Sequence, residues 1–200
     1  MSGLQACWRE YFGKFARGGN GHQLYLLLEG RYNEPLRTFH NPEHIQRCMA
    51  EQPQIERWAE HPARVELALL THGADYYPAR EDDVSAKLAQ YFAREIGLSS
   101  ADVDEVYWLA LEGRTHSVCP HIDYQLVSDI DYLFLAAPRA EFEALLRNLS
   151  LEYSAAGIPF STKALLEDLL DRDFIFQSGH YRFYYENRAR NNIIYALQAA

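Results

Sequence analysis

The chain has 200 residues, with 19 Lys or Arg against 28 Asp or Glu, and a formal net charge of −9. This balance argues against bulk nucleic-acid binding, because neutralising phosphates requires a basic surface. The length fits one domain, and a hydrophobic content of 48% is sufficient for a buried core. Three cysteines without a CxxC spacing exclude a disulfide scaffold and favour a reducing compartment.

Neither a membrane span nor a secretory signal is visible in the sequence. The apolar clusters at 25–28 and 132–137 are far shorter than the roughly 20 residues that a span requires. Arg9 and Glu10 interrupt the N-terminal segment before an apolar signal core can form. We therefore predict a cytoplasmic protein whose partner is a small molecule, with no membrane or nucleic-acid partner. The oligomeric state is not indicated.

Apolar residues recur at three- and four-residue spacings along most of the chain, which predicts an all-α fold in a single domain over 1–200. A first helix ends at the Gly18-Gly19-Asn20-Gly21 turn, and Asn41-Pro42 marks the start of a third. Residues 76–83 are predicted to form a polar loop. After the first helix, the predicted helices are 22–32, 42–51, 54–70 with a break at His61-Pro62, 85–96, 102–111, 123–136, 139–155, 161–171 and 179–198.

The placement of the histidines points to a site. His40 and His44 are four residues apart, and so lie on one helix face. His72 ends a strongly apolar, and therefore central, helix, and His116 ends another. Asp131 enters a very apolar run, where an unpaired charge would be costly.

Histidines and carboxylates from separate helices suit a divalent ion such as Zn, Fe, Mn or Ni. The alternative interpretation is that each histidine caps its helix or is a satisfied polar group of the core. Spacing alone leaves both interpretations open. Cys48, one turn beyond His44, is interpreted as a small buried apolar residue.

Several segments also carry a known family pattern. They are RYNEPLRTFHNPEHI at 31–45, ALLTHGADYYP at 68–78, DDVSA at 82–86, RTH at 114–116, SDIDY at 128–132 and ENRARN at 186–191. Together they resemble bacterial HD-superfamily proteins regarded as metal-dependent phosphohydrolases. The resemblance covers about residues 25–195. It implies an HD-like helical bundle that holds a metal at its centre and acts on a small phosphorylated or nucleotide-like molecule.

The resemblance also implies roles for individual residues. The metal ligands would be His44, His72 and Asp131. His40 and His116 would lie beside them as extra ligands or phosphate contacts, and Asp82 would be a general acid or base. Arg37, close to the histidines in sequence, is either a clamp for a phosphate or carboxylate or a solvated loop charge.

One departure from the family pattern keeps the function open. The signature His-Asp pair is His72-Gly73 here, and glycine offers no donor atom. Asp75 could replace the carboxylate only if the helix end unwinds. The segments 149–153 and 161–162 also lack the arginines of the family pattern. Three outcomes fit: a hydrolase with an altered site, an inactive HD-like protein that binds a ligand or partner, and an iron-dependent non-hydrolytic enzyme.

The C-terminal segment offers two further features. Six aromatic residues lie between 174 and 185, with arginines among and after them; they form either a core seam or a stacking surface for single-stranded nucleic acid, and the acidic net charge favours the seam. Glu186 and Arg190 are four residues apart on one predicted helix, and form either a surface pair or a buried structural ion pair.

Overall fold

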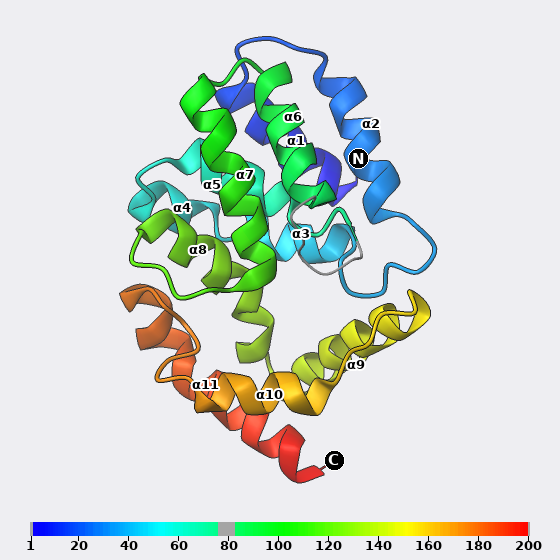
Figure 1. Ribbon diagram of the computed structural model, residues 1–200, viewed down its shortest axis with the longest axis vertical. Helices are drawn as coiled ribbons and strands as arrows, with labels where there is room; N and C mark the ends of the chain where they lie inside the picture. Colours follow the sequence, from blue (N-terminus) through cyan, green and yellow to red (C-terminus); the bar gives the residue numbers. More distant parts are fainter. Residues whose placement is uncertain (1, 76–82, 200) are drawn as a thin grey trace.

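In the computed structural model, which describes residues 2–75 and 83–199, every regular element is a helix (Figure 1). The predicted all-α class is therefore confirmed. The elements in chain order are α1 (Gly3–Phe15), α2 (Gly21–Tyr32), α3 (Pro42–Met49), α4 (Gln52–Trp58), α5 (Pro62–Thr71), α6 (Val84–Glu95), α7 (Ser100–Thr115), α8 (Ile122–Asp131), the 3-10 helix η1 (Tyr132–Ala136), α9 (Arg139–Ala155), α10 (Thr162–Asp171) and α11 (Gly179–Ala199).

Capping side chains and prolines set most of the helix starts. The Asn41 side chain accepts a hydrogen bond from the His44 amide at 3.0 Å, and Pro42 follows at the first helical position. The predicted break at His61-Pro62 is present, because α4 ends at Trp58 and α5 begins at Pro62. These caps fix where α3 and α5 begin, and hence where their histidines lie.

Two elements differ from the sequence prediction by more than two residues. The predicted helix 102–111 begins at Ser100 and continues to Thr115. The predicted helix 123–136 changes at Asp131 into the 3-10 helix η1. Asn192 of α11 donates hydrogen bonds to the carbonyls of Leu135 and Ala137, both at 2.9 Å, and so holds the end of η1 in this tighter form.

The helix α5 is the centre of the molecule. All its residues from Val65 to Thr71 are buried, including the polar Glu66 and Thr71. A helix that is buried all round must have neighbours on every side, and α5 packs against α1, α3, α4, α6, α7 and α8. Since His72 directly follows α5, the central position of this helix places His72 in the interior.

The C-terminal helices α9, α10 and α11 lie at the lower end of the molecule in Figure 1. A buried clamp joins α11 to the segment before it. The Glu186 carboxylate accepts the amide hydrogens of Ile175 and Phe176 at 3.0–3.1 Å and pairs with Arg190 Nε at 2.7 Å. Arg190 also donates to three backbone carbonyls, those of Leu170, Arg172 and Asp173. Of the two interpretations of this pair, the structural ion pair is therefore the one observed.

The aromatic run at 174–185 is divided between core and surface. Phe176 and Tyr181 are fully buried, as a core seam requires, whereas Phe183 and Tyr184 are 79% and 62% exposed. None of the helices in the described ranges combines the length and the apolarity needed to cross a bilayer.

Candidate metal centre

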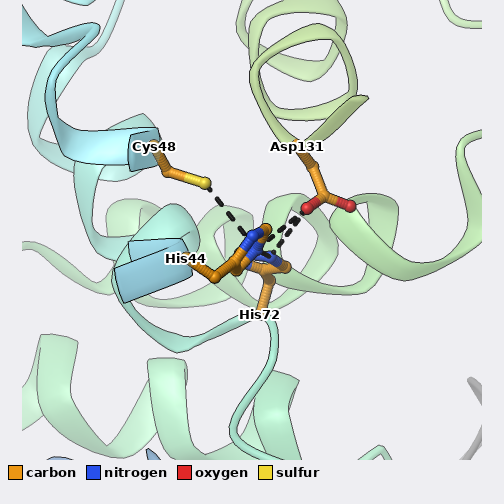
Figure 2. Close-up of side chains that lie close together, drawn as sticks. All are labelled: His44, Cys48, His72 and Asp131. Atoms are coloured by element: carbon orange, nitrogen blue, oxygen red, sulfur yellow. Dashed lines mark hydrogen bonds and ion pairs between the residues drawn. The ribbon is translucent and has the colours of Figure 1, made fainter. Parts of the chain in front are cut away.

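Three donor atoms from three helices meet in the interior, as Figure 2 shows. His44 comes from α3, His72 from the end of α5 and Asp131 from the end of α8. His44 Nε2 lies 3.0 Å from His72 Nε2 and 3.0 Å from Asp131 Oδ1, and His72 Nε2 lies 3.2 Å from the same oxygen. The structure thus brings together all three residues predicted as ligands. We call them the triad.

The hydrogen bonding of His72 determines which of its ring nitrogens faces the other two triad residues. His72 Nδ1 lies 2.9 Å from the carbonyl oxygen of Leu69, which can only accept, so Nδ1 carries the proton. In the neutral ring, Nε2 then presents a lone pair to His44 Nε2 and Asp131 Oδ1. The single proton on His44 Nε2 can go either to His72 Nε2 or to Asp131 Oδ1. In both cases His72 Nε2 and Asp131 Oδ1 face each other as two acceptors. A cation between the three atoms would satisfy all of them.

The spacing of the donor atoms fits one transition-metal ion. With metal–ligand bonds of about 2.1 Å, donors separated as these are would subtend angles of about 90–100° at the ion. Such angles correspond to three adjacent positions of an octahedron, so positions on the other side would remain open. Two histidines and one carboxylate are a known mononuclear ligand set with open positions.

Cys48 adds a fourth potential donor. Its Sγ lies 3.7 Å from His44 Nε2, one helical turn along α3, and the four donor atoms all lie within 4.8 Å of one another (Figure 2). Burial raises the pKa of the Cys48 thiol well above its ordinary value, so the thiolate would form there only beside a cation. Cys48 is buried in the core, as predicted, and its i, i+4 spacing from His44 places its sulfur beside the triad.

The triad lies at a cavity of about 310 Å³, at the lower end of the range for small-molecule sites. His72 and Asp131 line it, together with His40, Asp75 and His116. Its other walls are largely aromatic and carry one arginine; they include Phe39, Tyr132, Phe134, Tyr153, Phe160 and Arg172. A small molecule held in this cavity would therefore contact His72 and Asp131, whereas His44 does not line it.

His116 orients the carboxylate of the triad. Its Nε2 lies 3.1 Å from Asp131 Oδ2, the oxygen that does not face the other two histidines, and its Nδ1 lies 3.0 Å from Ser128 Oγ. The ring stacks on Tyr132 with centroids 3.7 Å apart. Its backbone has φ 48°, a left-handed conformation that is uncommon outside glycine. His116 thus lies beside the triad, as the resemblance implied.

The environment of Arg37 in the structure fits neither of the two sequence interpretations. Its guanidinium is buried and donates to the carbonyls of Gly73 and Ala74 at 2.6 and 2.9 Å, with Glu34 at 3.2 Å. It is neither a solvated loop charge nor one of the residues that line the cavity. Arg37 instead fixes the turn that follows His72.

Two aspartates that the sequence suggests for the site, as a general acid or base or in place of the missing carboxylate, have different outcomes. Asp75 lines the cavity, and its backbone amide donates to Ser85 Oγ at 2.9 Å. Its carboxylate is not part of the donor cluster around His72. Asp82 lies outside the described residues.

Comparison with known proteins adds no relative. No protein-family model, no curated protein and no solved structure matches this chain. The chemistry of the site is therefore argued from its own atoms, and the likeness to HD-superfamily proteins stays a hypothesis.

The triad predicts that the metal-free protein loses stability in acid. Burial, partly offset by Asp131, lowers the pKa of His44 from 6.5 to about 4. Below pH 6.5 the unfolded chain therefore binds a proton that the folded protein does not. The free energy of unfolding should fall by up to about 3 kcal/mol between pH 6.5 and pH 4.

Asp131 acts in the same direction at lower pH. Although burial opposes its ionisation, His72, His116 and His44 hold its pKa well below 3.8, so its contribution is lost as the pH falls further. Urea unfolding of metal-free protein at several pH values measures the slope. His44→Gln should reduce the change in unfolding free energy with pH above pH 4. An unchanged pH dependence in that variant would contradict the assignment to His44.

Proposed function

We propose that this protein is a metal-dependent hydrolase of the HD type. It binds one divalent transition-metal ion through His44, His72 and Asp131 and cleaves a small phosphorylated or nucleotide-like molecule. The observation that carries the proposal is the convergence of three buried donor atoms at 3.0–3.2 Å beside a cavity of about 310 Å³. Gly73, in place of the family's aspartate, removes a carboxylate that a second ion would need.

The residues around the cavity have separate tasks in this proposal. A bound divalent ion would act as a Lewis acid on an oxygen of the substrate. His116 holds Asp131 in the orientation that leaves Oδ1 facing the two other ligands. Arg172, kept in place by Asp168 at 2.8 Å, supplies a positive charge at the cavity for a phosphate. The aromatic walls provide flat apolar surfaces for a base or other ring.

A second function has support from the donor spacing. Two histidines and one carboxylate on adjacent positions are also the ligand set of non-haem iron enzymes that activate oxygen. An iron-dependent oxidative enzyme on the same helices would hold iron selectively and consume oxygen. A hydrolase would work with zinc, manganese or nickel and without oxygen.

Elemental analysis of protein purified without added metal or chelator tests the proposal first. We expect near one equivalent of a transition metal per chain. The loaded protein should hydrolyse p-nitrophenyl phosphate or bis(p-nitrophenyl) phosphate, and stripping the metal should abolish this activity. Metal-free protein that also takes up no added zinc, manganese, cobalt or nickel would refute the proposed site.

Cobalt(II) loading shows whether Cys48 belongs to the ligand set. A thiolate ligand gives an intense near-ultraviolet sulfur-to-cobalt band, in addition to the weak visible bands of the ion. Cys48→Ser would remove the near-ultraviolet band if Cys48 binds, and Cys7→Ser, which lies outside the cluster, serves as the control. Visible bands without the near-ultraviolet band would restrict the ligands to the triad.

A further inference from the structure

A buried carboxylate holds His40 at the wall of the cavity. Glu152 of α9 is 1% exposed. Its Oε2 accepts the backbone amide hydrogens of Phe39 and His40 at 2.7 and 3.0 Å, and its Oε1 lies 2.7 Å from His40 Nδ1. Burial raises the pKa of Glu152, but the hydrogen bonds from His40 and Phe39 outweigh burial and hold this pKa below its ordinary value. Glu152 is thus a charged acceptor that fixes both the backbone and the ring of His40.

This pairing leaves Nε2 as the ring nitrogen of His40 that Glu152 does not contact. A carboxylate can only accept, so Nδ1 carries the proton and Nε2 of the neutral ring presents a lone pair. The ring lines the same cavity as His72 and Asp131, with its centroid 6.5 Å from that of His72. It is not itself one of the clustered donor atoms. His40 therefore stands beside the triad without belonging to it.

Gly73 makes room for the ring. A Cβ atom added at Gly73 would lie 3.1 Å from His40 Cδ2 and 3.3 Å from His40 Cβ, closer than side chains normally pack. The residue that departs from the His-Asp signature is therefore the one against which His40 packs. A side chain at position 73 would therefore require the His40 ring to shift by a few tenths of an ångström.

We infer that His40 is the proton acceptor for the reaction at the triad and that Glu152 is its positioning residue. This inference rests on the proposed function. A water or hydroxyl group that enters the cavity gives its proton to His40 Nε2: the O–H bond breaks and an N–H bond forms. Nδ1 keeps its proton in the bond to Glu152, so the imidazolium that results is paired with a buried carboxylate. The oxygen keeps the electron pair and becomes the nucleophile.

The test separates proton transfer from metal binding by using zinc-loaded protein and the two nitrophenyl phosphates. His40→Asn keeps an amide hydrogen for Glu152 but places no ring nitrogen in the cavity. We expect the turnover rate to fall by about 100-fold or more, with unchanged zinc content. Gly73→Ala should slow turnover about tenfold by displacing the ring. Gly30→Ala is the matched control, because a Cβ atom there meets nothing within 4 Å.

Nitrogen NMR of the histidine side chains gives a measurement that needs no substrate. His40 should have its proton on Nδ1 and a bare Nε2 in the wild-type protein, and Glu152→Ala should abolish this preference. A proton on Nε2 instead, or full turnover in His40→Asn, would refute the role of His40 and leave the metal site intact. Wild-type protein that binds no zinc, or binds it and hydrolyses neither probe, would refute the proposed function and this inference with it.

Discussion

Asp131→Asn is expected to empty the metal centre. Oδ1 of Asp131 lies 3.0 and 3.2 Å from the two histidine nitrogens, and Oδ2 lies 3.1 Å from His116, so one carboxylate organises all three rings. Asparagine keeps the shape but removes the negative charge that offsets a divalent ion. Loss of a partner outside the direct ligands already weakens metal binding about 10–100-fold, so loss of this ligand should exceed about 100-fold.

Elemental analysis and competition with a chelator measure this loss. Helical circular dichroism should persist, because the substitution changes no side-chain volume. Asp104→Asn is the control, since Asp104 is exposed on α7 and takes no part in the cluster. An Asp131→Asn protein that retains its full metal content would show that the ligand set is different from the one proposed.

Glu186→Ala is expected to destabilise the fold by about 3 kcal/mol, because a buried hydrogen-bond donor left without its acceptor costs about 1–3 kcal/mol. The substitution leaves the amide hydrogens of Ile175 and Phe176 without their acceptor and removes the partner of Arg190. Arg190 would still be held among three backbone carbonyls, with its charge no longer balanced. Urea unfolding of the two proteins at neutral pH measures the difference.

The control for this effect is a pair with the same spacing on the surface. Lys163 and Glu167 are also four residues apart, on α10, and their side chains are 71% and 55% exposed. Glu167→Ala should change the free energy of unfolding by less than about 0.5 kcal/mol. Equal effects of Glu167→Ala and Glu186→Ala would contradict the structural role of the buried pair.

Helix positions were predictable where local signals exist. The Asn41-Pro42 start and the His61-Pro62 break follow from short-range chemistry, and both occur where the sequence places them. The change from α8 to η1 has no such signal. It depends on Asn192, whose hydrogen bonds reach carbonyls 55 and 57 residues earlier in the chain. Contacts of that length are set by packing and cannot be read from a short window.

The site shows the same division. The spacing and the family resemblance together nominated His44, His72 and Asp131, and the fold brings them together. In the segment 149–153 the sequence pattern indicates only the missing arginine and gives Glu152 no role, because the contacts of Glu152 lie 112 and 113 residues away in the chain. Arg37 was misjudged for a related reason, since its carbonyl acceptors at Gly73 and Ala74 belong to another part of the chain.

Gly73 shows how a missing side chain can be misread from sequence. In the comparison with the His-Asp signature, Gly73 appears only as the loss of a metal ligand. In the structure, the space beside His72 is occupied by His40, whose ring packs against the glycine. A sequence comparison can record that loss, but His40 comes from the segment that precedes α3, and its contact with Gly73 is visible only in three dimensions.

The order of the site residues along the chain has a consequence for protein synthesis. The triad is complete once residue 131 has left the ribosome, and α3, α5 and α8 come from the part of the chain made by then. Glu152 follows on α9, so the partner of His40 is made only after all three triad residues. Under the proposed function, the chain would therefore have its metal ligands in full before the residue that positions its proton acceptor has been added.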